Sequence, residues 1–142
     1  KDVNPTVNII FTVSPVRHLK DGFVENAQSK AHLLSAIHQI AAQNKTVKYF
    51  PSYEIMMDDL RDYRFYASDM LHPNETAINY IWEQFKLVWM AENTTGIMNE
   101  VETIQKGLAH KPFNSTSMQH QAFLENLKQK MAALKKNYNI DF

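Results

Sequence analysis

Apolar residues follow one another almost without interruption over residues 7–13 and again over residues 46–50. Both runs are rich in β-branched and aromatic residues, and Pro15 and Pro51 follow them closely, as is typical of short strands. Between the two runs, over residues 25–43, apolar positions recur with the spacing of one helix face. The pattern therefore predicts two parallel strands joined by a right-handed helical crossover, which is a βαβ unit.

The first predicted strand is apolar on both of its sides, so we expect it to be covered on both faces, as in a parallel sheet. Two parallel strands do not form a stable sheet by themselves, and no further strand pattern follows Phe50. The chain also opens with Lys1 rather than with a translation start. We therefore interpret the sequence as a piece of a longer protein, whose other strands come from upstream of Lys1 or from another chain.

The rest of the chain is predicted to be mainly helical. A short helical stretch is expected at residues 54–57, and a long helix after Pro73, which suits a first-turn position. Two further amphipathic helices are expected, one over residues 97–108 and one near Thr116, where Thr116 and Gln119 resemble a capping box.

Charge and composition narrow the possible partners, because the 15 Lys+Arg residues balance the 15 Asp+Glu residues. This balance argues against a nucleic-acid partner, and no apolar run approaches the ~18 residues of a membrane helix, so we expect no membrane partner either.

The absence of Cys excludes disulfides and thiolate catalysis, and it fits a reducing, cytoplasmic location. The 3 Gly residues leave no room for a phosphate-binding loop. Because the His residues lack the spacing of a helical metal pair, we expect no metal and no cofactor.

Asp69 and His72 are the clearest candidates for chemistry. An Asp three residues before a His, just ahead of a predicted helix, can bring a carboxylate into contact with an imidazole. The carboxylate then accepts from one ring nitrogen, fixes the tautomer and leaves the other nitrogen as a base. The alternative is a structural role, in which Asp69 bonds backbone amides where the loop meets the helix.

Ser14, Arg17 and His18 form a second cluster, at the carboxyl end of the first predicted strand. Ligands of open α/β sheets gather at this edge, so we expect these three residues to bind substrate. Arg17 suits an anionic or carbonyl group, and His18 can titrate. The alternative is an ordinary turn, in which Ser14 bonds its own backbone and Arg17 is solvated.

Four runs of residues carry a resemblance to a known family: FTVSPVRH at 11–18, YFPSYE at 49–54, DYRFY at 62–66 and SDMLHP at 68–73. The first run is followed by Asn26, Ser29, Lys30 and Ala31, which also match. In this order they are similar to the GSCFA family, a bacterial family related to the SGNH (GDSL-like) esterases. The resemblance covers residues 5–85. It is expected to fade in the two final helices.

The resemblance implies an α/β fold, namely part of a flavodoxin-like, three-layer α/β/α domain of the SGNH type. Residues 1–92 are then the carboxyl-terminal half of that domain, and residues 93–142 a helical extension. It also implies a serine esterase that acts on ester-linked acyl groups, with His72 as the general base and Asp69 as its orienting acid.

The nucleophile of this chemistry has no match here. No segment of this sequence matches the family's Gly-Ser motif, which carries the nucleophile. The Gly and Asn that complete the oxyanion hole of SGNH enzymes have no match in it either. Ser14 and Ser68 lie near the candidate residues but lack the glycine-flanked turn that exposes a nucleophilic serine. We therefore expect the full-length protein to be a hydrolase and this chain alone to be inactive.

The expected substrate is a small-molecule or glycan-linked acyl ester, and the open sheet edge is expected to allow a homo-oligomer. The competing hypothesis is a non-catalytic helical interaction module. In that case Asp69 and His72 are structural, and the apolar stripes of the final helices bind a partner.

Overall fold

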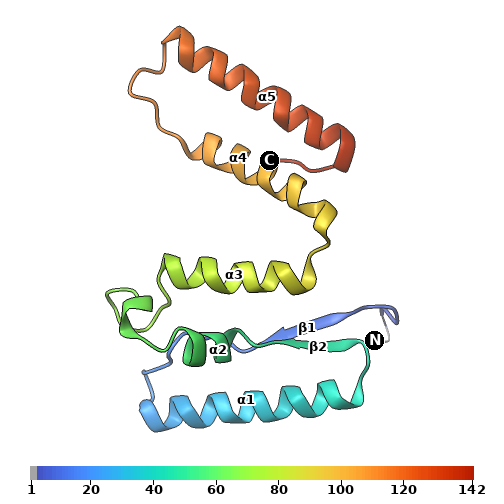
Figure 1. Cartoon of the computed structure of the whole chain (residues 1–142), viewed down its shortest axis with the longest axis vertical. Helices are drawn as coiled ribbons and strands as arrows, with labels where there is room; N and C mark the ends of the chain where they lie inside the picture. Colours follow the sequence, from blue (N-terminus) through green and yellow to red (C-terminus); the bar gives the residue numbers. More distant parts are fainter. Residues whose placement is uncertain (1–2) are drawn as a thin grey trace. The chain divides into compact units, whose positions relative to one another are not determined.

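The computed structural model describes residues 3–142 and divides the chain into two compact units. The first, Lys1–Trp89, contains both strands and is called the α/β unit. The second, Met90–Phe142, is called the helical unit. Figure 1 shows the elements of both units, which are described separately below.

The α/β unit begins with the predicted βαβ arrangement. Strand β1 (Ile9–Thr12) is followed by helix α1 (Phe23–Gln43) and strand β2 (Val47–Phe50). The two strands are parallel, with Ile9 opposite Val47 and Thr12 opposite Phe50. The prediction of neighbouring parallel strands with a helical crossover is therefore confirmed, with both strands somewhat shorter than the apolar runs.

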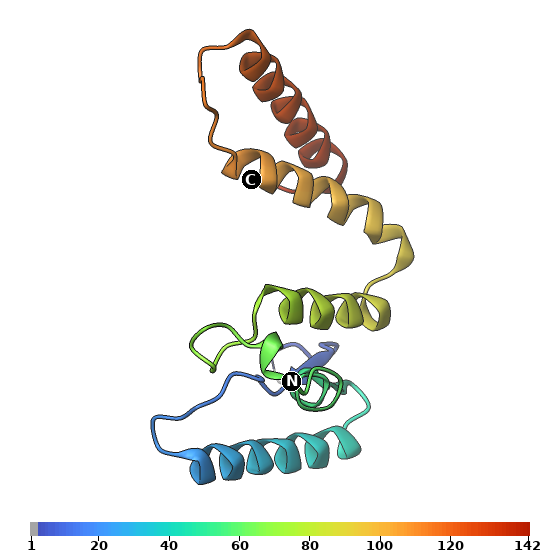
Figure 2. The same cartoon turned by 60° about the vertical axis from the view of Figure 1, so that its left-hand side comes forward.

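Helices α1 and α3 lie on opposite sides of the two strands, as both views show (Figures 1 and 2). The expectation that β1 is covered on both faces is nevertheless wrong for the described chain, because Ile10 remains 40% exposed. Its side chain borders an open cavity that is also lined by Ile78 and Trp82 of α3. A continuous apolar run thus identifies the strand correctly but does not guarantee that each side chain is packed.

After β2 the chain forms a short helical segment, α2 (Ser52–Glu54), which continues as the π-helical turn Ile55–Asp59. The Leu60 backbone N–H donates to the Ile55 carbonyl at 3.0 Å, which is the wider hydrogen bond of a π-turn. This segment places Met56 and Leu60 in a buried cluster with Tyr66 and Ala77. The predicted short helix is confirmed and is part of the core.

Helix α3 (Glu75–Trp89) begins two residues after Pro73. The Asn74 side chain accepts from the Ala77 N–H at 3.1 Å, so Asn74 is the N-cap. Pro73 instead pairs with Tyr66 in an isolated antiparallel bridge. The prediction that Pro73 lies in the first helical turn is therefore wrong, because Asn74 provides a better cap.

The helical unit contains α4 (Thr95–Ala109), preceded by the 3₁₀ turn Glu92–Thr94, and α5 (Met118–Tyr138). The two long helices lie side by side in both views (Figures 1 and 2), and Ile104, Leu127 and Leu134 form their buried core. Ser117, not Thr116, caps α5, because its side chain accepts from the His120 N–H. The capping box predicted for Thr116 and Gln119 is thus wrong by one residue.

No helix within residues 3–142 combines the length and the apolar character required to cross a bilayer.

Candidate functional site

Residues 67–72 form a compact turn ahead of α3, which we call the Asp-His loop. The Ala67 N–H donates to the His72 carbonyl at 2.8 Å, and the Met70 N–H donates to the Ala67 carbonyl at 2.9 Å. One oxygen of Asp69, Oδ1, accepts from the Leu71 N–H at 2.9 Å and from the His72 N–H at 3.0 Å. The Asp69 side chain therefore closes the turn that carries His72.

The other oxygen of Asp69 contacts the imidazole, with 2.6 Å between Oδ2 and Nδ1 of His72. The carboxylate favours a proton on Nδ1, which leaves Nε2 as the nitrogen that can accept a proton. The sequence left open whether Asp69 orients His72 or bonds backbone amides at the start of the helix. In the structure Asp69 does both, because one oxygen accepts from the amides and the other contacts the imidazole.

Hydrogen bonding to the carboxylate lowers the pKa of Asp69 from 3.8 to about 2. The His72 N–H contributes most, followed by the Leu71 N–H and then the His72 side chain. Donors directed at a carboxylate stabilise its charged form. Asp69 is therefore fully ionised at neutral pH, as an orienting acid must be.

The end of β1 carries a set of hydroxyl groups. The Ser52 hydroxyl donates to the Val13 carbonyl at 2.8 Å, so Thr12 is the donor in the 2.6 Å contact between the Thr12 and Ser52 hydroxyls. The Ser14 Oγ accepts from the Val16 N–H at 3.2 Å. Ser14 therefore stabilises its own turn, as the structural alternative for this cluster anticipated.

Lys30 is a residue of this region to which the sequence analysis assigned no role in the site, although it is among the residues that carry the family resemblance. It is only 8% exposed, and its Nζ donates to the Ser14 carbonyl at 2.6 Å. Burial lowers the pKa of Lys30. A signal was present, because Lys30 stands three residues after Ala27 and four before Leu34, on the apolar face of its helix.

A cavity of about 640 Å³ opens between the strands and α3, at the carboxyl end of β1. Ser14 and His72 both line it, so the two predicted clusters meet at this cavity. Its remaining lining is mainly apolar, with Ile10, Phe50, Ile81 and Trp82 prominent. This volume lies in the range of small-molecule sites, which are commonly apolar with a few polar groups.

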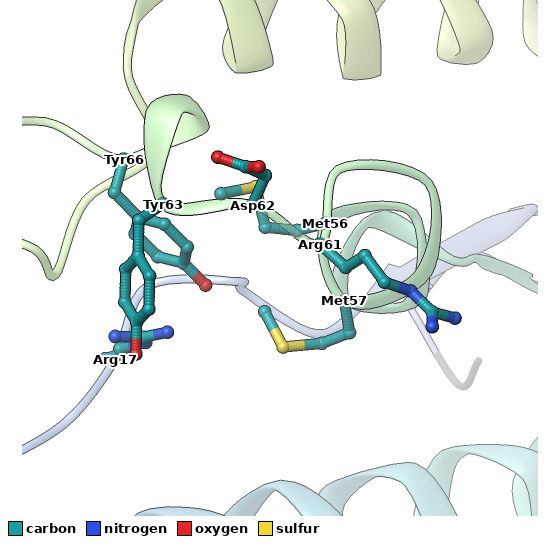
Figure 3. Close-up of a pocket in the computed structure, with 7 residues that line it drawn as sticks. All are labelled: Arg17, Met56, Met57, Arg61, Asp62, Tyr63 and Tyr66. Carbon is teal, nitrogen blue, oxygen red and sulfur yellow. The ribbon is translucent and has the colours of Figure 1, made fainter.

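Arg17 and His18 lie outside the lining of that cavity. The Arg17 guanidinium donates to the Met70 carbonyl at 3.3 Å and lies over the ring of Tyr66, with 4.2 Å to the ring centroid. Figure 3 shows it beside Tyr63 and Tyr66. These three residues line a smaller cavity of about 220 Å³. The exposed His18 ring lies 3.5 Å from the Asp21 carboxylate. Substrate binding by Arg17 and His18 thus stays a prediction.

No group of three His, Asp or Glu side chains suited to hold a metal ion occurs among the described residues 3–142.

Comparison with known families tests the resemblance. The model of the GSCFA family matches residues 1–85, which include both candidate clusters. The chain belongs to the GSCFA family. A second model, the C-terminal domain of GSCFA domain proteins, matches residues 101–142. The expectation that the likeness fades in the two final helices is therefore wrong, since this GSCFA model covers α5 and most of α4.

Searches among curated proteins gave no match to this chain. Among solved structures there was no match either.

Proposed function

We propose that this GSCFA chain supplies the general base and the orienting acid of an SGNH-type serine esterase that acts on ester-linked acyl groups. The observation that carries the proposal is the 2.6 Å contact between Asp69 and the His72 imidazole, at a cavity lined by both His72 and Ser14. In this proposal, the α/β unit is part of a flavodoxin-like domain that residues outside the 142 complete.

The proposed reaction begins when Nε2 of His72 takes the proton of a serine hydroxyl. That serine attacks the ester carbonyl, and His72 returns the proton to the leaving alcohol as the acyl-enzyme forms. Water, deprotonated by the same nitrogen, then releases the carboxylic acid and restores the serine. Asp69 stays ionised throughout and stabilises the imidazolium, which its lowered pKa supports.

The nucleophile is proposed to lie outside this chain. Ser14 uses its hydroxyl oxygen to stabilise a local turn, and Ser68 belongs to the tight loop that Asp69 closes. Neither is flanked by glycine. The proposed substrate is a small-molecule or glycan-linked acyl ester, and Ser14 is the predicted substrate contact that shares a cavity with His72.

The test uses the full-length gene product and short-chain aryl esters. His72→Ala is expected to lower kcat by roughly 10⁶-fold, because members of a catalytic triad act as a unit. His32→Ala is the matched control, since His32 is an exposed histidine on α1 and is expected to leave the rate unchanged. Ester hydrolysis that survives His72→Ala would reject the catalytic assignment.

The location of the nucleophile has its own test. The 142-residue chain alone is expected to show no ester hydrolysis above background. Turnover by this chain that His72→Ala abolishes would instead point to Ser14 or Ser68 as the nucleophile. Labelling with a fluorophosphonate followed by peptide mapping identifies the reactive serine in either case.

The second candidate function is a helical interaction module. Large apolar side chains in the helical unit favour it, because Phe113 and Met118 are essentially fully exposed and Leu108 is 53% exposed. This candidate predicts that the full-length protein has no ester hydrolysis for His72→Ala to remove.

A further inference from the structure

We propose that Arg17 is a positioning residue, which holds the Asp-His loop in the conformation that orients His72. The catalytic part of this inference rests on the proposed esterase function. The structural part stands on the geometry of the loop alone.

The Asp-His loop contains an unfavourable backbone conformation. Met70 has a φ of 61°, in the left-handed region that residues with a β-carbon seldom adopt. This conformation lets the chain reverse so that the Leu71 and His72 amides both reach Asp69 Oδ1. A loop of this kind persists only where surrounding contacts hold it.

Arg17 supplies two such contacts to consecutive carbonyls. Its backbone N–H donates to the Leu71 carbonyl at 3.1 Å, and its Nη1 donates to the Met70 carbonyl at 3.3 Å. The Met70 carbonyl belongs to the peptide that joins Met70 to Leu71, and the Leu71 carbonyl to the peptide that joins Leu71 to His72, so the two donors fix the orientation of both peptides. Both peptides lie between Asp69 and His72, the residues whose mutual geometry matters.

The guanidinium is itself anchored to the core of the α/β unit. It lies 4.2 Å from the Tyr66 ring centroid and 5.2 Å from that of Tyr63. Figure 3 shows the guanidinium beside the two tyrosines. Tyr66 is only 9% exposed and packs with Met56 and Leu60. Stacking on aromatic rings with simultaneous donation from the edge is suited to a planar guanidinium and not to an ammonium group.

The segment that carries Arg17 is also fixed on both sides. Lys30 donates to the Ser14 carbonyl at 2.6 Å, and the His18 N–H donates to Asn26 Oδ1 at 2.8 Å. Both partners belong to α1. Arg17 therefore connects a rigid segment after β1 with the strained turn that contains Met70.

The first experiment measures the loop directly, in this chain, by solution NMR. Arg17→Lys is expected to shift the amide signals of Leu71 and His72 and to raise the titration midpoint of the Asp69 carboxyl from about 2 towards 3.8. Because Lys keeps the positive charge, the change reports the lost geometry of the guanidinium. Unchanged Asp69, Leu71 and His72 signals would overturn the proposal.

Arg61→Lys is the matched control. Arg61 lines the same small cavity as Arg17, but it pairs with Asp58, so its replacement is expected to leave the Asp-His loop signals unchanged (Figure 3). If Arg17→Lys does not fold, Arg17→Gln provides the second variant, and unchanged signals of β1, β2 and the carboxyl-terminal half of α1 show that the α/β unit of either variant is folded.

The second experiment measures ester hydrolysis by the full-length protein. A positioning role predicts that Arg17→Lys lowers kcat by up to about 10²-fold, the effect of a catalytic group misplaced by about 1 Å, with KM unchanged. A raised KM with unchanged kcat would overturn the proposal in favour of direct substrate binding. If the protein hydrolyses no ester, the proposed function fails, while the NMR result still decides whether Arg17 holds the loop.

Discussion

The contacts inside the α/β unit differ in kind from the contacts inside the helical unit. In the α/β unit, side-chain hydrogen bonds join residues far apart in sequence, such as Arg17 to Met70 and Thr12 to Ser52. In the helical unit, typical side-chain bonds are local, such as those from Lys135 to Asp141 and from Gln121 to Ser115. There, the long-range contacts that define the core are apolar ones around Ile104.

This difference indicates which unit is built to orient reactive groups. Long-range polar contacts cost conformational freedom and desolvation, and they are useful where particular groups must be oriented. Apolar packing between two helices stabilises a fold without orienting any reactive group. Substitutions in the two units should therefore separate into those that alter the Asp-His loop and those that alter stability alone.

The largest expected effect comes from one core truncation in each unit. Met56→Ala and Ile104→Ala each remove a fully buried side chain, so each should lower the free energy of unfolding by about 2–5 kcal/mol. Met56 packs with Tyr66, so Met56→Ala should also shift the NMR signals of the Asp-His loop. Ile104→Ala should leave those signals unchanged. An equal response of the loop to both substitutions would contradict the comparison.

The second prediction concerns the pH dependence of the Asp-His loop. Because the pKa of Asp69 is lowered to about 2, its contribution to loop stability is complete above its ordinary value of 3.8 and is lost as the pH falls through about 2. A ¹³C NMR titration of the Asp69 carboxyl should give a midpoint near 2. In His72→Ala the midpoint should stay well below 3.8, since the two amide donors, of His72 and Leu71, remain.

A titration of Asp69 at its ordinary value would show that the amide bonds of the loop do not persist in solution. A midpoint that returns to 3.8 only in His72→Ala would show that the imidazole, and not the backbone, is the main donor.

The outline of the fold could be predicted from the sequence because it depends on local periodicity. Residues 7–13, 25–43 and 46–50 contain β1, most of α1 and β2. The contact between Asp69 and His72 was also foreseeable, because three residues in a turn leave few ways to arrange two such side chains.

The contact of Arg17 with Met70 could not be predicted in the same way, whereas the helical spacing does place Lys30 on the apolar face of α1. Arg17 meets Met70 across 53 positions of sequence, and such a contact leaves no periodic pattern in one sequence. Similarly, periodicity identifies the start of a helix but does not choose between adjacent residues that can both cap it. This explains why the prediction placed Pro73 in the first turn of α3, where Asn74 is the cap, and chose Thr116 in place of Ser117 as the cap of α5.

A third prediction concerns Ser117, the N-cap of α5 in the helical unit. Ser117→Ala should lower the free energy of unfolding by about 1 kcal/mol, because the His120 N–H loses its acceptor. Thr116→Ala is the matched control and should change stability by less than about 0.5 kcal/mol, since the Thr116 hydroxyl bonds only locally, to Asn114. Chemical denaturation measures both. The reverse order would restore the capping box at Thr116 and Gln119.

The smallest expected effect is a gain in stability in α4. Gly96→Ala places a methyl group where no atom lies within 4 Å, so it should stabilise the helical unit by about 0.5 kcal/mol through helix propensity and a less flexible unfolded chain. Gly107→Ala, in the same helix, is the matched comparison. There the new Cβ would lie 2.7 Å from Leu127 Cδ1 and 3.3 Å from Phe123 Cζ, so strain should cancel the gain. Thermal unfolding distinguishes the two, and NMR should show the Asp-His loop unchanged in both. If Gly96→Ala alters the loop signals, the two units are coupled, and local packing in the helical unit is not independent of the site.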